Sequence, residues 1–248
     1  MQWTGNPSVH FAFELAGYVA AAIVYTMVRQ RRGDAIPDQS RALVLAAAAL
    51  GGSIGTRLLF WLCDPGLPPR FDGKTVVGGL LGGLIGVEIA KRIAGVTRST
   101  GDLLVLPLIT AMCIGRIGCF LAGPIDHTAG DPTTLPWGIA IADGVRRHPV
   151  ALYEIAFLLL LAPFVARRRR HEGDQFRVFM TAYLAFRLAV DFIKPEPKPL
   201  LLGMSAIQWA CVAGLVYYAS VFSNDHRHAS IPLLRRRRVD LHDVLPQD

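Results

Sequence analysis

Seven apolar stretches alternate with shorter polar segments along the chain. They cover about residues 8–28, 41–63, 75–94, 103–122, 150–166, 177–193 and 203–222. A helix of about 20 largely apolar residues is long enough to cross a lipid bilayer. None of these stretches has the wide polar face of a helix in a soluble bundle. The pattern therefore predicts an all-α, polytopic integral membrane protein with about seven transmembrane helices.

The polar segments suggest how this protein is organised. We expect residues 1–222 to form a single seven-span membrane domain, and residues 223–248 to form a basic cytoplasmic tail. The longest outer loop covers 123–149 and is rich in Pro, Gly, Thr and Asp. Two short echoes, GGSIG at 51–55 and GGLIG at 82–86, have the small-residue spacing that is typical of closely packed membrane helices.

Composition supports a membrane protein and excludes several other classes. Hydrophobic residues make up 52% of the chain and charged residues 18%, against roughly 25% charged residues in soluble domains. This composition excludes a disordered chain, a collagen and a coiled coil. The four cysteines form no CxxC pair, so we expect neither a disulfide scaffold nor a metal site.

The net charge of +7 is distributed unevenly. With seven alternating spans, one set of loops carries 17 of the 26 Lys and Arg residues, the other set carries 6, and 3 lie within spans. The positive-inside rule then places the N-terminus outside and the C-terminus in the cytoplasm. The arginine runs 167–170 and 235–238 could suggest nucleic-acid binding, but at cytoplasmic span ends they are better explained as topology anchors.

The three arginines within spans are Arg57, Arg116 and Arg187, and all lie in the outer half of the predicted membrane. Ionisable residues are costly inside a membrane and usually face a cavity or a partner. A guanidinium group can bind a phosphate through two parallel hydrogen bonds. We therefore expect an anion site at the depth of a phospholipid headgroup. The alternative is simple pairing with carboxylates, such as Arg187 with Asp191 at i+4.

Several segments resemble the signature motifs of the prolipoprotein diacylglyceryl transferase family. Residues 115–120 (GRIGCF), 136–138 (PWG) and 147–154 (RHPVALYE) are similar to the family's GRxGNF, PWG and RHPxQLYE. Residues 52–57 (GSIGTR), 185–194 (AFRLAVDFIK) and 203–208 (GMSAIQ) are similar to three further family motifs, and the resemblance extends over about residues 10–220.

The resemblance implies a seven-span enzyme of the bacterial inner membrane that works at the outer leaflet. Such an enzyme moves diacylglycerol from phosphatidylglycerol to the thiol of a lipobox cysteine in a prolipoprotein, and requires no cofactor. A base would deprotonate the thiol, because the thiolate is the nucleophile. Matched to the family motifs, Arg116, Arg187 and His148 are the expected catalytic residues. The expected substrate-binding residues are Arg57, Asp191, Tyr153, Glu154 and Cys119.

The chain departs from the family pattern at two kinds of position. The family has a histidine before a glycine pair in the third span, where this chain has Val77 or Leu81. Cys119 occupies the place of the signature asparagine, and Ala122 and Pro124 replace the next two polar residues.

These departures leave the base and the activity open. On the outer side, His148 or His127 could serve as base. Cys119 beside Arg116 could be a nucleophile, although a buried cysteine more often packs as a small apolar residue. One hypothesis is therefore the transferase, or a relative with a different acceptor. The other is a non-catalytic protein that binds or translocates lipid on the same frame.

Overall fold

The computed structural model describes residues 7–33, 38–65, 73–123, 129–141, 144–167, 171–194 and 200–230. Within this part the chain forms seven α-helices, each of which overlaps one predicted apolar stretch. They are α1 (Pro7–Arg32), α2 (Asp38–Cys63), α3 (Val76–Ala94), α4 (Val105–Ala122), α5 (Val150–Ala166), α6 (Asp174–Val190) and α7 (Ala206–Ser230). The prediction of an all-α fold is confirmed.

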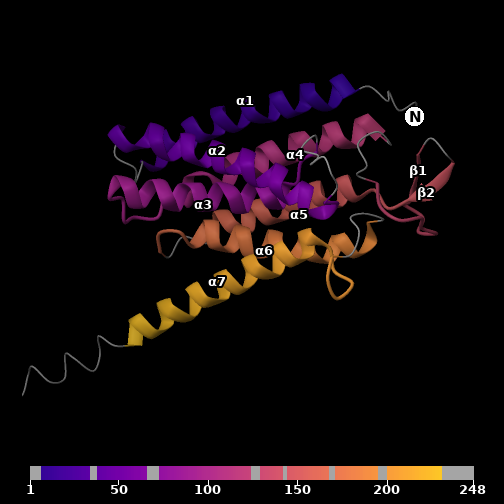
Figure 1. Ribbon diagram of the computed structural model, residues 1–248. Helices are drawn as coiled ribbons and strands as arrows, with labels where there is room; N and C mark the ends of the chain where they lie inside the picture. Colours follow the sequence, from indigo (N-terminus) through magenta and orange to yellow (C-terminus); the bar gives the residue numbers. More distant parts are fainter. Residues whose placement is uncertain are drawn as a thin grey trace, which may run out of the picture.

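The helices run roughly alongside one another (Figure 1). The most extensive packing is between α2 and α3 and between α1 and α4, while α6 packs against both α5 and α7. Toward its C-terminal end, α7 diverges from the other helices (Figure 1). Two single-turn 3-10 helices complete the helical part: η1 (Gly101–Leu103) leads into α4, and η3 (Asp191–Ile193) continues from α6.

The outer surface of the bundle is apolar, as a membrane protein requires. Three helical segments, Ser8–Arg32, Gln39–Cys63 and Gly101–Ala122, are long and apolar enough to cross a membrane. Large apolar side chains such as Leu160 on α5 and Ile93 on α3 are about three-quarters exposed (76% and 74%). Surface of this kind is stable only in an apolar solvent.

Glycines allow α2 and α3 to pack at close range. A Cβ atom added at Gly51 would overlap the carbonyl oxygen of Gly82, and one added at Gly55 would overlap that of Gly78. The helices therefore touch backbone to backbone, and the close packing predicted from the two glycine echoes is confirmed.

Hydrogen bonds join the C-terminal part of α2 to the start of α3. The Thr56 hydroxyl donates to the Thr75 carbonyl at 2.7 Å, and the Thr75 amide donates to the Thr56 hydroxyl at 2.8 Å. Thr75 is also the N-cap of α3 and accepts from the Gly78 amide. The hydrogen bonds to Thr56 of α2, together with the N-cap Thr75, thus fix where α3 begins.

The expected outer loop contains a small β-hairpin at one end of the bundle. Strands β1 (Ile139–Ile141) and β2 (Val145–Arg147) are antiparallel, with Ile139 opposite Arg147 (Figure 1). This hairpin was not anticipated from the sequence. The Gly130 amide donates to the His148 carbonyl, and the Asp131 amide donates to the Ile193 carbonyl. These bonds attach the loop to the start of α5 and the end of η3.

Some expectations fall outside the described residues: those for His127, Pro124, the arginine run 168–170 and the chain after residue 230. The first residues of the expected cytoplasmic tail continue α7 as far as Ser230.

Candidate active site

A buried ion pair connects α4 to α5. Arg116 Nε lies 2.9 Å from Glu154 Oε2, and the Glu154 side chain is 1% exposed. Tyr183 of α6 donates its hydroxyl hydrogen to Glu154 Oε1 at 2.9 Å. Three helices thus converge on one carboxylate, and both of its oxygens are engaged.

A second buried ion pair lies at the C-terminal end of α6. Arg187 Nη2 is 2.8 Å from Asp191 Oδ1, with 6% and 0% of the two side chains exposed. The i+4 spacing places both residues on one face of the helix, and η3 continues that face beyond Val190. The Arg187–Asp191 pairing, which the sequence offered as the alternative to an anion site, is therefore present.

The start of α7 supports Asp191 from the other side. Ser205 precedes the helix and Gln208 is its third residue, the spacing of a capping box. The Gln208 amide donates to the Ser205 hydroxyl at 3.1 Å, and the Ser205 amide donates to Gln208 Oε1 at 2.8 Å. The Ser205 hydroxyl hydrogen is then free to donate to Asp191 Oδ2, at 3.0 Å. We refer to Arg116, Glu154, Tyr183, Arg187, Asp191 and Ser205 together as the ion-pair network.

The network has hydrogen-bonding capacity that its own members do not use. Arg187 Nη1 is buried and has no hydrogen-bond partner among the described residues. An unsatisfied donor in a buried, cationic group is costly, and an anionic oxygen would satisfy it with a charge-assisted hydrogen bond. The geometry thus fits a bound anion beside Arg187.

Cys119 lies one helical turn from Arg116 on α4. Arg116 Nη1 donates to Cys119 Sγ at 3.7 Å, and Cys119 is 7% exposed. A thiol sulfur is a weak acceptor, so this contact leaves the guanidinium capable of a stronger one. Cys119 packs in the helix interface as a small apolar residue would.

His148 and Tyr153 belong to a separate cluster at the base of the outer loop. His148 Nδ1 is 3.1 Å from the Tyr153 hydroxyl oxygen, which accepts from Trp137 Nε1 at 2.8 Å. Tyr153 and Glu154 are adjacent on α5, but consecutive helical residues point about 100° apart. Glu154 therefore enters the ion-pair network, whereas Tyr153 turns toward the loop.

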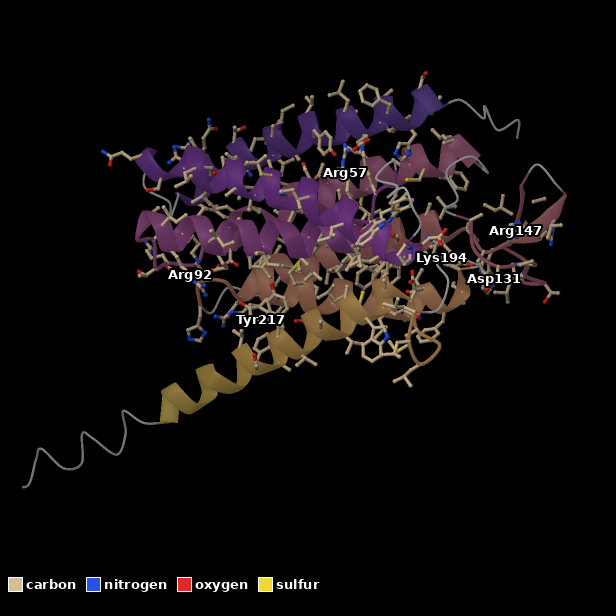
Figure 2. The ribbon with its side chains drawn as sticks, viewed as in Figure 1. Arg57, Arg92, Asp131, Arg147, Lys194 and Tyr217 are labelled. Atoms are coloured by element: carbon tan, nitrogen blue, oxygen red, sulfur yellow. The ribbon has the colours of Figure 1, made fainter. Side chains whose placement is uncertain are left out.

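Arg57 differs from the other two membrane arginines. It is exposed on α2, whereas Arg187 is 5% exposed. Figure 2 shows Arg57 on the side of the bundle near α1, and Lys194 toward the end that carries the β-hairpin. The structure thus brings Arg116 and Arg187 into one network and leaves Arg57 outside it. Its binding of lipid stays a prediction.

Two features of the network were missed in the sequence. Tyr183 lies in an apolar span, and a tyrosine in such a span gives no specific indication of a functional site. Ser205 and Gln208 did carry a signal, because S-x-x-Q before an apolar run predicts a helix start. A further ion pair, between Lys74 Nζ and Glu14 Oε1 at 2.7 Å, links the residue just before the N-cap of α3 to the first half of α1. Across the described residues, no group of three or more His, Cys, Asp or Glu could hold a metal ion.

Comparison with known proteins gives a consistent result. The family model for prolipoprotein diacylglyceryl transferase matches residues 10–223. The chain is also similar to three curated proteins, each named phosphatidylglycerol–prolipoprotein diacylglyceryl transferase. The protein of Geobacter sulfurreducens is 32% identical over 75% of this chain and 77% of its own length. That of Clostridium tetani is 27% identical over 84% and 89%, and that of Nitratidesulfovibrio vulgaris is 35% identical over 71% and 70%.

Proposed function

Since the chain belongs to the prolipoprotein diacylglyceryl transferase family, we propose that it transfers diacylglycerol from phosphatidylglycerol to the thiol of a lipobox cysteine. In this reaction the sulfur bonds to the glycerol carbon that carries the phosphate ester. The carbon–oxygen bond to phosphate breaks, and glycerol phosphate leaves with the electron pair. Negative charge therefore builds up on a phosphate oxygen in the transition state.

The observation that carries this proposal is the unpartnered Nη1 of the buried Arg187. Asp191 holds the other side of the guanidinium, so Nη1 is oriented before any substrate arrives. A fixed donor in a water-poor site stabilises developing charge more strongly than a mobile one in water. Arg116, which is held by Glu154, supplies a second positive charge to the same network.

The enzyme would lie in the bacterial inner membrane as a seven-span protein with its active site toward the outer leaflet. Supporting this orientation, basic residues of the last turns of α1 and α3 lie opposite the hairpin. Figure 2 shows Arg92 at one end of the bundle and Arg147, Asp131 and Lys194 at the other. Reporter fusions after residue 33 and after residue 95 should both report a cytoplasmic location.

The activity is tested by complementation in a bacterium depleted of its own diacylglyceryl transferase. Expression of this chain should restore growth and add the mass of one diacylglyceryl group to a reporter lipoprotein. A chain that inserts in the membrane yet leaves the reporter mass unchanged would rule out the transferase and favour the lipid-binding alternative. As a second test of the site, purified Arg116→Ala and Arg187→Ala variants should each lose phosphatidylglycerol binding.

A further inference from the structure

A short hairpin of leucines leads into α7. In this leucine hairpin, residues 200–204 (LLLGM), the Leu200 amide donates to the Met204 carbonyl at 2.8 Å, and the Met204 amide donates to the Leu201 carbonyl at 3.0 Å. The indole Nε1 of Trp209 on α7 donates to the same Leu201 carbonyl at 3.1 Å. Hydrogen bonds within the hairpin and from α7 thus hold these leucines in a defined structure.

Leu202 forms the tip of the leucine hairpin in an unfavourable backbone conformation. Its φ is +52° and that of Gly203 is +73°, and within the described ranges Leu202 is the only residue other than glycine with a positive φ. The Cβ atom of leucine crowds the backbone in this region, whereas asparagine and glycine tolerate it. The turn alone would therefore form more readily without leucine, so an interaction of the Leu202 side chain has to offset the strain.

The packing of the described residues does not supply that interaction. Leu202 is 81% exposed, more than the membrane-facing Leu160 on α5, and Leu200 and Leu201 are also more than half exposed. None of the three leucines belongs to the core clusters that the described residues form. A single exposed leucine is ordinary on a protein surface, but three in succession make an apolar patch of the kind that marks a contact with a partner or a membrane.

The position of the leucine hairpin favours lipid as the partner. The orange segment that precedes α7 projects from the side of the bundle rather than from its end (Figure 1). Since the helices cross the membrane, a segment that projects sideways meets lipid, whereas one that projects along the helix axes meets water. Phe192, which follows Asp191 of the ion-pair network, is also 64% exposed. The amphipathic indole of Trp209, which supports the hairpin, is of a kind enriched at membrane–water interfaces.

We propose that the leucine hairpin is a membrane anchor whose three leucines insert into the leaflet at the end of the bundle that carries β1 and β2, at the boundary between headgroups and acyl chains. Burial of these side chains in lipid offsets the strain at Leu202. The hydrogen bonds of the hairpin satisfy backbone groups that would otherwise need water. Ser205 directly follows Met204 and donates to Asp191, so the anchor also holds the start of α7 beside the ion-pair network.

Spin-label accessibility, measured on the full chain in phosphatidylglycerol nanodiscs, tests this placement. A nitroxide is attached at Leu202→Cys, and the unaltered chain, whose four cysteines are buried or partly buried, gives the background labelling. Oxygen concentrates among the acyl chains, whereas a nickel–EDDA complex stays in water. The matched control is Ala140→Cys, an exposed position on β1. Relative to that control, oxygen should relax the Leu202→Cys label at least threefold more and the nickel complex at least threefold less.

Three results would overturn the membrane anchor. Relaxation by the nickel complex equal to that of the Ala140→Cys label would place the leucines in water. An immobilised label that is shielded from both reagents would place them against protein, such as a second copy of this chain. Added lipobox peptide should leave both accessibilities unchanged, and shielding that develops only with the peptide would assign the hairpin to the acceptor instead of to lipid.

The Leu202→Asn variant separates the side chain from the turn. Asparagine tolerates the left-handed backbone, so the thermal unfolding temperature should rise or stay within about 2 °C of that of the unaltered chain. In this background a label at Leu200→Cys should become at least threefold more accessible to the nickel complex, because the tip has lost its apolar side chain. Unchanged accessibility would show that Leu202 does not anchor the hairpin. These measurements need no turnover, so their outcome is independent of the transferase function proposed above.

Discussion

The interface between α2 and α3 differs from the interface of α4, α5 and α6 in how the helices contact one another. The first brings backbones together through glycines such as Gly51 and Gly55. The second separates its helices by the side chains of Arg116, Glu154 and Tyr183. The charged interface retains an unused donor, Arg187 Nη1. We infer that the glycine interface stabilises the fold, whereas the charged interface contains the groups that take part in the reaction.

The sharpest test of this division is Arg187→Lys. Lysine can still neutralise Asp191, but it lacks the second arm of the guanidinium that leaves Nη1 for an anion. We expect kcat/KM for diacylglyceryl transfer to fall at least about 100-fold, the scale found for removal of one transition-state donor. Arg57→Lys is the matched control and should stay within threefold, because Arg57 is exposed outside the network and lysine keeps the positive charge that could bind lipid. Equal losses in both variants would contradict the separation of the two arginines.

Glu154→Gln tests whether the charge of the network, rather than its shape, orients Arg116. Glutamine keeps an acceptor for Tyr183 but removes the negative charge, leaving a buried guanidinium without its counter-ion. Breaking one side of a buried pair costs about 3–5 kcal/mol, so we expect a large drop in thermal unfolding temperature together with a roughly 30-fold loss of activity. The nearby Tyr153→Phe variant should leave the unfolding temperature within about 2 °C.

The glycine interface should respond in stability alone. A Cβ at Gly55 would overlap the Gly78 carbonyl oxygen, so Gly55→Ala forces the helices apart. We expect a loss of about 1–3 kcal/mol in unfolding free energy with kcat per folded molecule within threefold. Gly79→Ala is the control, because a Cβ atom added at Gly79 would lie 3.8 Å from its nearest neighbour, Thr56 Cβ. An activity loss in Gly55→Ala without lower stability would show that this interface takes part in the chemistry.

Cys119→Ser should have the smallest effect. Serine has nearly the same shape, and its hydroxyl can accept from Arg116 in place of the sulfur. We expect activity within about threefold of the unaltered chain. If Cys119 formed a covalent lipid intermediate, serine would abolish turnover, and an intact-mass measurement of the unaltered chain would detect the adduct.

The sequence predicted the helices well because each one is a long apolar run. It missed the β-hairpin, since strands of three residues such as Ile139–Ile141 are too short to show alternation. It singled out Arg116 and Arg187 as a pair at similar depth because a charge in an apolar run stands out, and the structure buries both of them in ion pairs. Depth alone could not separate Arg57 from them, since depth does not tell which side of a helix faces the core.

Other site residues escaped notice for physical reasons of their own. Tyr183 lies in an apolar span, and its role depends on Glu154, which is 29 positions earlier in the chain. Adjacent motif residues can also diverge: Tyr153 and Glu154 belong to one sequence motif but contact different partners. Membership of one motif thus predicts which region of the fold a residue occupies better than it predicts which side chains that residue contacts.

The capping box at the start of α7 has a consequence for how the protein is made. Ser205 lies just before α7, which follows the other six described helices in the chain, yet its hydroxyl is the partner of Asp191 Oδ2. Until α7 has been synthesised and inserted, one oxygen of that carboxylate lacks its donor. A nascent chain that already contains Arg116, Glu154 and Arg187 therefore still lacks one hydrogen bond of the site until α7 is in place.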